Sequence, residues 1–148
     1  MKENNYPANK LIIVGEDDLD DKDILEELFS SIDPSVQQHF LNNGEKLVRF
    51  LETAEAKDLP CLILLDYNMP GLNGAEILSS LQNNARLKHV PKIIWSTSNA
   101  IIFKNKCLEL GARDYLVKPS SIKDLKDMLR YILSFCSNDE ARPEASTC

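Results

Sequence analysis

Short apolar runs alternate along this chain with longer segments in which apolar residues recur every three to four positions. The short runs have the length of β-strands, and the periodic segments are typical of amphipathic helices. The predicted strands are Lys10–Val14, Val36–Leu41, Cys61–Leu65, Lys92–Trp95 and Asp114–Val117. Several runs are apolar at successive positions, which predicts strands buried on both faces of a parallel sheet.

One helical segment follows each predicted strand. The first has an N-cap at Asp20 or Asp21 and ends before Asp33-Pro34, and the second spans about Glu45–Ala56. The third helix centres on Ala75–Leu81, and the fourth ends at Leu110. The fifth carries an apolar stripe from Ile122 to Cys136. Strands that alternate with helices through short loops predict an α/β fold, a five-stranded parallel sheet covered on both faces by five helices.

Composition narrows the class of protein. A chain of 148 residues predicts one domain, which we place at residues 10–137, between a flexible segment 1–9 and a disordered tail 138–148. The net charge of −6 argues against direct binding of nucleic acid. No apolar run approaches the roughly 18 residues of a membrane helix, and the N-terminus lacks the apolar core of a signal peptide. We therefore expect a cytoplasmic protein with no membrane partner.

The four cysteines do not form a metal-binding pattern. No pair has C-x-x-C spacing, and His39 and His89 have no neighbours typical of metal ligands. We interpret Cys61, Cys107 and Cys136 as small core residues and Cys148 as a free thiol in the tail.

Polar side chains follow four of the predicted strands. Glu16, Asp17 and Asp18 follow the first, Asp66 the third, Ser96 and Thr97 the fourth, and Lys118 the fifth. In a parallel sheet these strand ends share one edge, where ligands bind in open α/β folds. Crowded carboxylates repel one another unless a positive charge lies among them. Oxygen ligands of this kind favour Mg²⁺, or Mn²⁺.

This arrangement predicts phosphoryl chemistry. Asp66 would be the nucleophile, because aspartyl phosphates are established covalent intermediates. Lys118 and the metal would offset the charge that develops on the transferred group. Each feature taken alone has a simpler interpretation, since acids cap helices, Ser-Thr-Ser forms turns, and a lysine before proline is often solvated. Their joint occurrence at successive strand ends favours function.

The chain resembles the receiver domain of two-component response regulators from about Lys10 to Cys136. The resemblance rests on a set of motifs in order: Glu16-Asp17, Asp66 with Met69-Pro70 and Gly74, Ser96-Thr97, and Tyr115 with Lys118-Pro119. It implies a flavodoxin-like (βα)5 three-layer sandwich. It also implies that Asp66 accepts a phosphoryl group from a sensor histidine kinase or a histidine phosphotransfer protein.

The resemblance assigns roles to the other motif residues. Glu16, Asp17, Asp66 and the backbone carbonyl of Asn68 would bind Mg²⁺ or Mn²⁺, and Lys118 would contact the phosphoryl group. Ser96 and Tyr115 would form a two-state switch, and Thr97 would restrict the access of water to the phosphoryl group. The peptide bond before Pro119 would be cis. Trp95 departs from the commonest pattern, because it is bulky for the end of the fourth strand.

The sequence leaves no room for an output domain after the fifth helix, so we expect a stand-alone receiver that signals by protein–protein contact. It would be a monomer or weak homodimer, with an unknown downstream protein as partner. It would not be an enzyme, beyond catalysing its own phosphorylation and dephosphorylation.

Three alternatives stay open. A phosphatase of the haloacid dehalogenase type needs an acid two residues after the nucleophile, where this chain has Asn68. A flavin or nucleotide carrier needs a Gly- or Ser/Thr-rich phosphate loop, but the loop after the first strand is acidic. The third alternative is a receiver-like module that binds its partner without phosphorylation.

Overall fold

The computed structural model describes residues 10–136. The segments 1–9 and 138–148, for which we predict flexibility, and the thiol of Cys148 lie outside the described residues. The strands are β1 (Leu11–Gly15), β2 (Gln37–Leu41), β3 (Leu62–Asp66), β4 (Lys92–Ser96) and β5 (Asp114–Val117). The α-helices are α1 (Leu19–Ile32), α2 (Gly44–Thr53), α3 (Gly74–Leu81), α4 (Ile101–Glu109) and α5 (Ile122–Leu133). Three short 3₁₀ turns, η2 (Ala56–Asp58), η3 (Ala85–Leu87) and η4 (Ser134–Cys136), complete the order.

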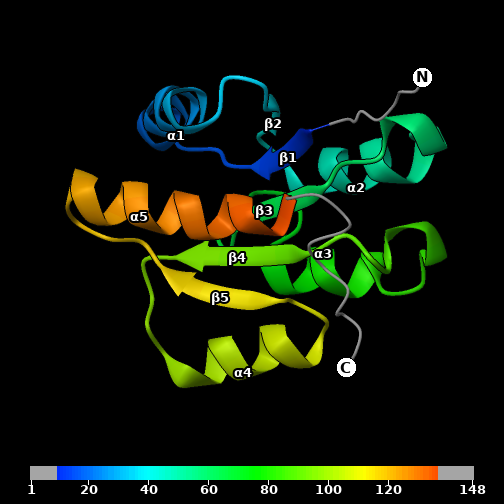
Figure 1. Cartoon of the computed structure of the whole chain (residues 1–148). Helices are drawn as coiled ribbons and strands as arrows, with labels where there is room; N and C mark the ends of the chain where they lie inside the picture. Colours follow the sequence, from blue (N-terminus) through cyan, green and yellow to red (C-terminus); the bar gives the residue numbers. More distant parts are fainter. Residues whose placement is uncertain (1–9, 137–148) are drawn as a thin grey trace, which may run out of the picture.

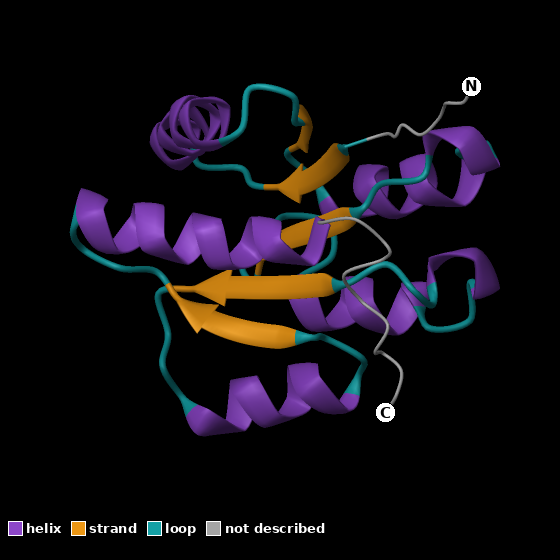
Figure 2. Ribbon diagram, viewed as in Figure 1, coloured by secondary structure: helices purple, strands orange, loops and turns teal. Residues whose placement is uncertain are grey.

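All five strands form one sheet in the order β2-β1-β3-β4-β5, and every neighbouring pair is parallel. The arrowheads of β4 and β5 point the same way in Figure 2, toward the loops that lead to α4 and α5. Asp66, the last residue of β3, is in register with Trp95 of β4. The predicted α/β fold with five parallel strands and five helices is therefore confirmed.

Two layers of helices cover the sheet, with α1 and α5 on one face and α2, α3 and α4 on the other (Figure 1). Successive residues of a strand point to opposite faces of the sheet. In β3, for example, Leu62 and Leu64 pack toward α1 and α5, whereas Ile63 and Leu65 pack toward α2 and α3. All residues of β3 are buried, as its uninterrupted apolar run predicts.

Side-chain caps fix the start of most helices. The N-cap of α1 is Asp18, which accepts a hydrogen bond from the backbone N–H of Asp21, so our assignment to Asp20 or Asp21 was wrong by two or three residues. Asn73 and Glu76 form a reciprocal capping box at α3. Helix α4 differs, because its N-cap residue Ala100 has no side-chain oxygen and makes no capping hydrogen bond.

The cysteines agree only in part with their prediction. We predicted Cys61 and Cys136 as small core residues, and both do pack against the core, but the disulfide that joins Cys61, just before β3, to Cys136 in η4 was not predicted. The two residues are 75 positions apart, and a pairing over that distance leaves no periodic signal in the sequence. Cys107 agrees with its prediction as a core residue, because it is fully buried and free.

Two smaller points complete the fold. The peptide bond before Pro119 is trans, since the described residues contain no cis peptide bond, and the expectation of a cis bond was wrong. The trans form is also the intrinsic preference of X–Pro bonds, by about 0.5–1 kcal/mol. Among residues 10–136, no helix has the length and apolar character needed to cross a bilayer.

Candidate functional site

The parallel sheet gathers the predicted polar residues at its carboxyl edge. Glu16 directly follows β1, Asp66 ends β3, Ser96 ends β4, and Lys118 directly follows β5. Glu16, Asp66 and Ser96 are buried, with 1%, 6% and 1% of their surface exposed. Buried polar groups need partners, and here they find them in one another and in the surrounding loops.

Lys118 is the centre of this group. Its Nζ donates hydrogen bonds of 2.9 Å to Oδ2 of Asp66 and 2.9 Å to Oδ2 of Asp21, and lies 3.5 Å from Oε1 of Glu16. These contacts join the ends of β1, β3 and β5 to the first turn of α1. The side chain of Lys118 is only 13% exposed, so the ion pairs are poorly screened by water.

Hydrogen bonds from the backbone hold the two buried carboxylates in place. Asp66 Oδ1 accepts a hydrogen bond of 3.0 Å from the N–H of Asn68, in the turn after β3. Glu16 Oε2 accepts one of 3.1 Å from the N–H of Asp18, at the N-cap of α1. The orientation of each carboxylate is therefore set by the loop that follows its own strand.

The charges perturb one another. Burial and the neighbouring Asp66 carboxylate raise the pKa of Glu16 to about 8, although Lys118 partly offsets the effect. Burial by itself lowers the pKa of Lys118, but the hydrogen bonds to Asp66 and Asp21 and the charge of Glu16 outweigh it and raise that pKa above its ordinary value. Three carboxylates against one ammonium leave a negative excess at the site.

The carboxylates fit a hard divalent cation. Glu16, Asp21 and Asp66 each offer an oxygen atom, and these atoms lie within 4.8 Å of one another. Carboxylate oxygens are the preferred ligands of Mg²⁺ and are also suited to Mn²⁺. The raised pKa of Glu16 points the same way, because burial and the nearby Asp66 carboxylate both disfavour a second negative charge there, and a cation would offset that charge.

Sequence reasoning named Asp17, not Asp21, as the third carboxylate. The side chain of Asp17 is exposed and lies outside the group of three, so its role as a ligand stays a prediction. The role of the Asn68 backbone carbonyl as a ligand also stays a prediction. The structure shows only the N–H of Asn68 bonded to the site, where it donates to Asp66. Asp21 was considered only as a helix cap. Its position in the first turn of α1, one turn after Asp17, was the available signal.

The predicted switch residues, Ser96 and Tyr115, lie on the neighbouring strands β4 and β5. Ser96 Oγ accepts a hydrogen bond of 3.1 Å from the N–H of Ser98. Tyr115 is buried, and its hydroxyl donates a hydrogen bond of 2.9 Å to the carbonyl of Ser98. The two side chains are thus linked through the β4–α4 loop. Thr97, in the same loop, is exposed.

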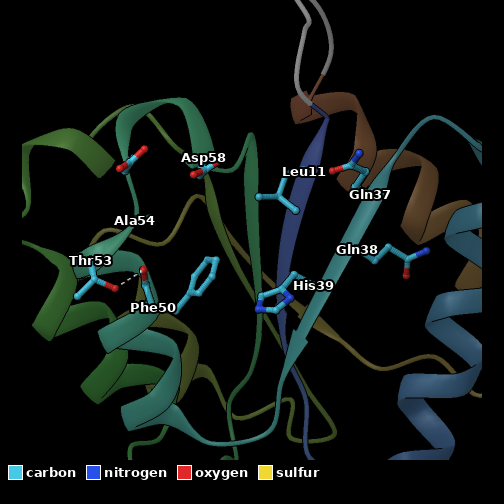
Figure 3. Close-up of a pocket in the computed structure, with 9 residues that line it drawn as sticks. Leu11, Gln37, Gln38, His39, Phe50, Thr53, Ala54 and Asp58 are labelled. Carbon is cyan, nitrogen blue, oxygen red and sulfur yellow. Dashed lines mark hydrogen bonds between the residues drawn. The ribbon is translucent and has the colours of Figure 1, made fainter.

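A separate cavity of about 470 Å³ lies at the free edge of β2, away from the carboxylates. It is bounded by β2, the end of α2 and η2, and the rings of His39 and Phe50 face each other there, 4.7 Å apart (Figure 3). The side chain of Gln38 turns away from it, toward α1, where its amide donates to the carbonyl of Glu26. The cavity contains none of the predicted site residues.

Comparison with known proteins places this site in a family. The family model of the response regulator receiver domain matches residues 12–130. Among curated relatives, "Two-component response regulator ORR5" of Oryza sativa subsp. japonica is 32% identical over 111 residues, which cover 70% of this chain and 83% of the relative. "Two-component response regulator ARR3" of Arabidopsis thaliana is 39% identical over 71 residues, which cover 48% of this chain and 31% of the relative. The chain thus spans about a third of that relative's length.

Solved structures agree. The phosphorylated cyanobacterial phytochrome response regulator RcpA has a TM-score of 0.77 and 25% identity, over 86% of this chain and 94% of that one. The Mn²⁺-bound form of the response regulator Rcp1 has a TM-score of 0.74 and 30% identity, over 85% and 93% of the two chains.

Proposed function

The chain belongs to the response regulator receiver domain family, and on that premise we propose that Asp66 accepts a phosphoryl group from a phosphohistidine. The donor would be a sensor histidine kinase or a histidine phosphotransfer protein. The protein is not an enzyme with a separate substrate, but catalyses its own phosphorylation and dephosphorylation. The observation that carries the proposal is the buried carboxylate of Asp66, bonded to Lys118 and beside two further carboxylates.

The chemistry follows from these contacts. One carboxylate oxygen of Asp66 attacks phosphorus, the bond between phosphorus and the donor nitrogen breaks, and its electron pair stays on the imidazole of the donor. Lys118, already 2.9 Å from Asp66, stabilises the negative charge on the transferred oxygens. A bound Mg²⁺ or Mn²⁺ supplies further positive charge at the same place. Water later attacks phosphorus, the bond between phosphorus and the Asp66 oxygen breaks, and inorganic phosphate leaves, which restores the carboxylate. Thr97 limits the approach of that water.

The first test is intact-mass analysis after incubation with acetyl phosphate, with and without Mg²⁺. We expect wild-type protein to gain one phosphoryl group only with Mg²⁺, because Lys118 alone does not balance the carboxylates and the charge of the incoming phosphoryl group. Asp66→Asn keeps the size and a polar oxygen but removes the nucleophile, so it should gain nothing. An exposed acid on α1, changed in Asp23→Asn, is the matched control and should be labelled like wild type.

The outcome separates the open alternatives. An unlabelled wild-type protein, under conditions in which a known receiver is labelled, would refute the phosphoacceptor role and favour a module that binds without phosphorylation. Continuous release of inorganic phosphate from a phosphate monoester, which is neither a phosphohistidine nor an acyl phosphate, would instead favour the phosphatase alternative. Asn68 argues against that alternative, because an amide cannot transfer the proton.

The metal ligands need a test of their own. We propose that Glu16 and Asp66 hold the cation together with a third carboxylate, which is Asp17 by resemblance and Asp21 by position. A Mg²⁺ titration of Asp17→Asn and Asp21→Asn decides between them, since only loss of the true ligand weakens the apparent affinity strongly. Equal affinities in both variants and wild type would refute a third carboxylate ligand.

We further propose that the output is contact with another protein through the face formed by α4, β5 and α5. Apolar side chains are exposed there: Ile101 (65%), Ile102 (70%), Val117 (42%) and Ile122 (55%). Exposed apolar residues that gather on one face are typical of docking surfaces. Tyr115 of β5 is buried and donates a hydrogen bond to the carbonyl of Ser98, so it would link this face to the loop that follows Ser96.

We also propose that the protein acts as a monomer or weak homodimer in the cytoplasm. Sedimentation of the phosphorylated and unphosphorylated protein tests the oligomeric state. Ile102→Lys should abolish partner binding while leaving phosphorylation of Asp66 unchanged. Unaltered partner binding in that variant would refute this surface.

A further inference from the structure

Trp95 lies against the lysine of the phosphorylation site. It is the second-last residue of β4, in register with Asp66, and is 2% exposed. The Nζ of Lys118 lies over its ring, 4.4 Å from the centroid. Such a distance is within the range of a cation–π contact, in which the negative face of the ring attracts the ammonium.

The ring and the carboxylates hold the ammonium from different directions. Lys118 bonds to Asp66 and Asp21, and its ammonium also contacts the Trp95 ring. Lysine has a long side chain with four rotatable bonds, so its ammonium is positioned only where several contacts restrict it. The indole supplies a rigid surface whose own position is fixed by the core between α1 and α5.

The ring matters most when the carboxylates are occupied. A divalent cation held by Glu16, Asp21 and Asp66 would compete with Lys118 for these carboxylates and would weaken their attraction for the ammonium. The attraction of the indole for the ammonium is not lost in this way, because the ring is neither a metal ligand nor a phosphoryl acceptor. Trp95 can therefore keep Lys118 beside Asp66 when the carboxylates no longer do.

We propose that Trp95 is a positioning residue, which holds the ammonium of Lys118 over its ring so that it meets the phosphoryl group at Asp66. This inference rests on the proposed phosphoacceptor function. It assigns a role to a residue that neither attacks phosphorus nor binds the metal.

The kinetic test compares the rates of phosphorylation by acetyl phosphate at saturating Mg²⁺. Trp95→Leu removes the ring, and we expect the rate to fall about 3- to 10-fold, the range that a partly buried cation–π contact implies. Trp95→Phe keeps an aromatic face and should recover most of the loss. Leu129→Ala, a truncation of the fully buried Leu129 in the same core, should leave the rate within twofold of wild type.

These variants distinguish positioning from a loss of packing. If Leu129→Ala slows the reaction as much as Trp95→Leu, or if Trp95→Phe is no better than Trp95→Leu, the effect is one of general stability and the proposal is overturned. Far-UV circular dichroism of each variant at the assay temperature confirms that it is folded.

A spectroscopic test does not depend on phosphorylation. Trp95 is the one tryptophan of the chain, so all indole emission comes from it. Lys118→Met removes the charge above the ring and should shift the emission maximum or intensity of the metal-free protein. Lys123→Met, which removes an ammonium that is 85% exposed on α5, should change neither.

The kinetic test and the emission test can fail independently of each other. Identical emission from wild type, Lys118→Met and Lys123→Met would overturn the contact between Lys118 and Trp95. A wild-type protein that acetyl phosphate cannot label would instead refute the proposed function, and the emission of Lys118→Met would still decide whether the contact exists.

Discussion

At the scale of single residues, the site is organised by the balance of charge around Lys118. Three carboxylates contact this one ammonium, and two of them, Glu16 and Asp66, are buried. Desolvation makes each unbalanced charge expensive. The group is therefore under electrostatic strain that protons or a cation can relieve, and both should change the stability of the fold.

The raised pKa of Glu16 predicts how stability depends on pH without metal. Between the ordinary value of 4.5 and about 8, the folded protein binds a proton that the unfolded chain has lost. The free energy of unfolding must then fall as pH rises through this range. In EDTA, raising the pH from 5 to 8 should lower the Tm of wild type by about 4 °C more than it lowers the Tm of Glu16→Gln. Thermal unfolding of both proteins measures this difference.

Magnesium should reverse this trend, because a cation favours the deprotonated carboxylate. Adding Mg²⁺ at pH 8 should raise the Tm of wild type more than that of Glu16→Gln. Parallel pH profiles for the two proteins in EDTA would contradict the raised pKa of Glu16.

Sequence reasoning found three residues of this site and missed Asp21 and the contact of Trp95. Glu16, Asp66 and Lys118 were recognisable because each lies at the end of an apolar run. Asp21 was not, since an acid in the first turn of a helix is equally suited to the helix dipole. The contact between Trp95 and Lys118 joins two strand ends through the position of one side chain, and no spacing along the chain encodes it.

Gly44 shows how a single residue connects α2 to the loop after β3. Its N–H donates to the carbonyl of Pro70, and an added Cβ would lie 2.2 Å from the carbonyl oxygen of Leu72. We expect Gly44→Ala to lower the free energy of unfolding by about 1–3 kcal/mol, because backbone must move. Glu45→Ala, at the exposed neighbour, is the control for chemical denaturation and should cost less than about 1 kcal/mol.

At the scale of elements, α4 is held least firmly. Cys107 is its one buried residue, whereas α1, α2, α3 and α5 each bury three or more. Its N-terminus lacks a side-chain cap, and Ile101 and Ile102 are exposed there. Elements with few buried contacts open at low free energy, so α4 is the part of the described fold best able to respond to Asp66.

A capping substitution tests this interpretation. Ala100→Ser supplies the missing oxygen and should raise the stability of α4 by about 0.5–2 kcal/mol. We expect slower amide hydrogen exchange in α4, with little change in α3, which already has a capping box. Exchange in α4 of wild type as slow as in α5 would contradict a loosely held helix.

Element boundaries show where sequence patterns suffice. The five strands agree with prediction to within one residue or so, because each apolar run ends at a charge or a turn. Helix α2 is shorter than predicted and gives way to η2, because Ala54 and Glu55 take up extended backbone. Periodicity does not specify that change, as either conformation keeps the same apolar residues inside.

At the scale of the whole molecule, a disulfide cross-links the beginning and the end of the part of the described fold that runs from β3 to η4. The disulfide joins Cys61, just before β3, to Cys136 in η4, which follows α5. A cross-link over 75 positions restricts the unfolded chain and stabilises the fold by about 2–4 kcal/mol. Such bonds are uncommon in the cytoplasm, so the predicted location needs a direct test by fractionation.

Reduction should therefore lower stability. We expect excess reductant to lower the Tm of wild type by roughly 5–15 °C, measured by calorimetry. In Cys136→Ser, where no cross-link can form, reductant should have no effect. A wild-type Tm that does not respond, with thiol alkylation confirming complete reduction, would contradict a stabilising disulfide.

The all-parallel sheet has a consequence for how the chain reaches its fold. The closest pairing between strands, Ile93 with Asp114, already joins residues 21 positions apart, and Ile12 with Leu62 joins residues 50 apart. The sheet thus contains no hairpin that could form locally. High contact order slows folding, because the entropy cost of closing long loops comes before the strands gain any stabilising contacts with one another. The helices between the strands are the early structure available to this chain, and they must bring its strands together.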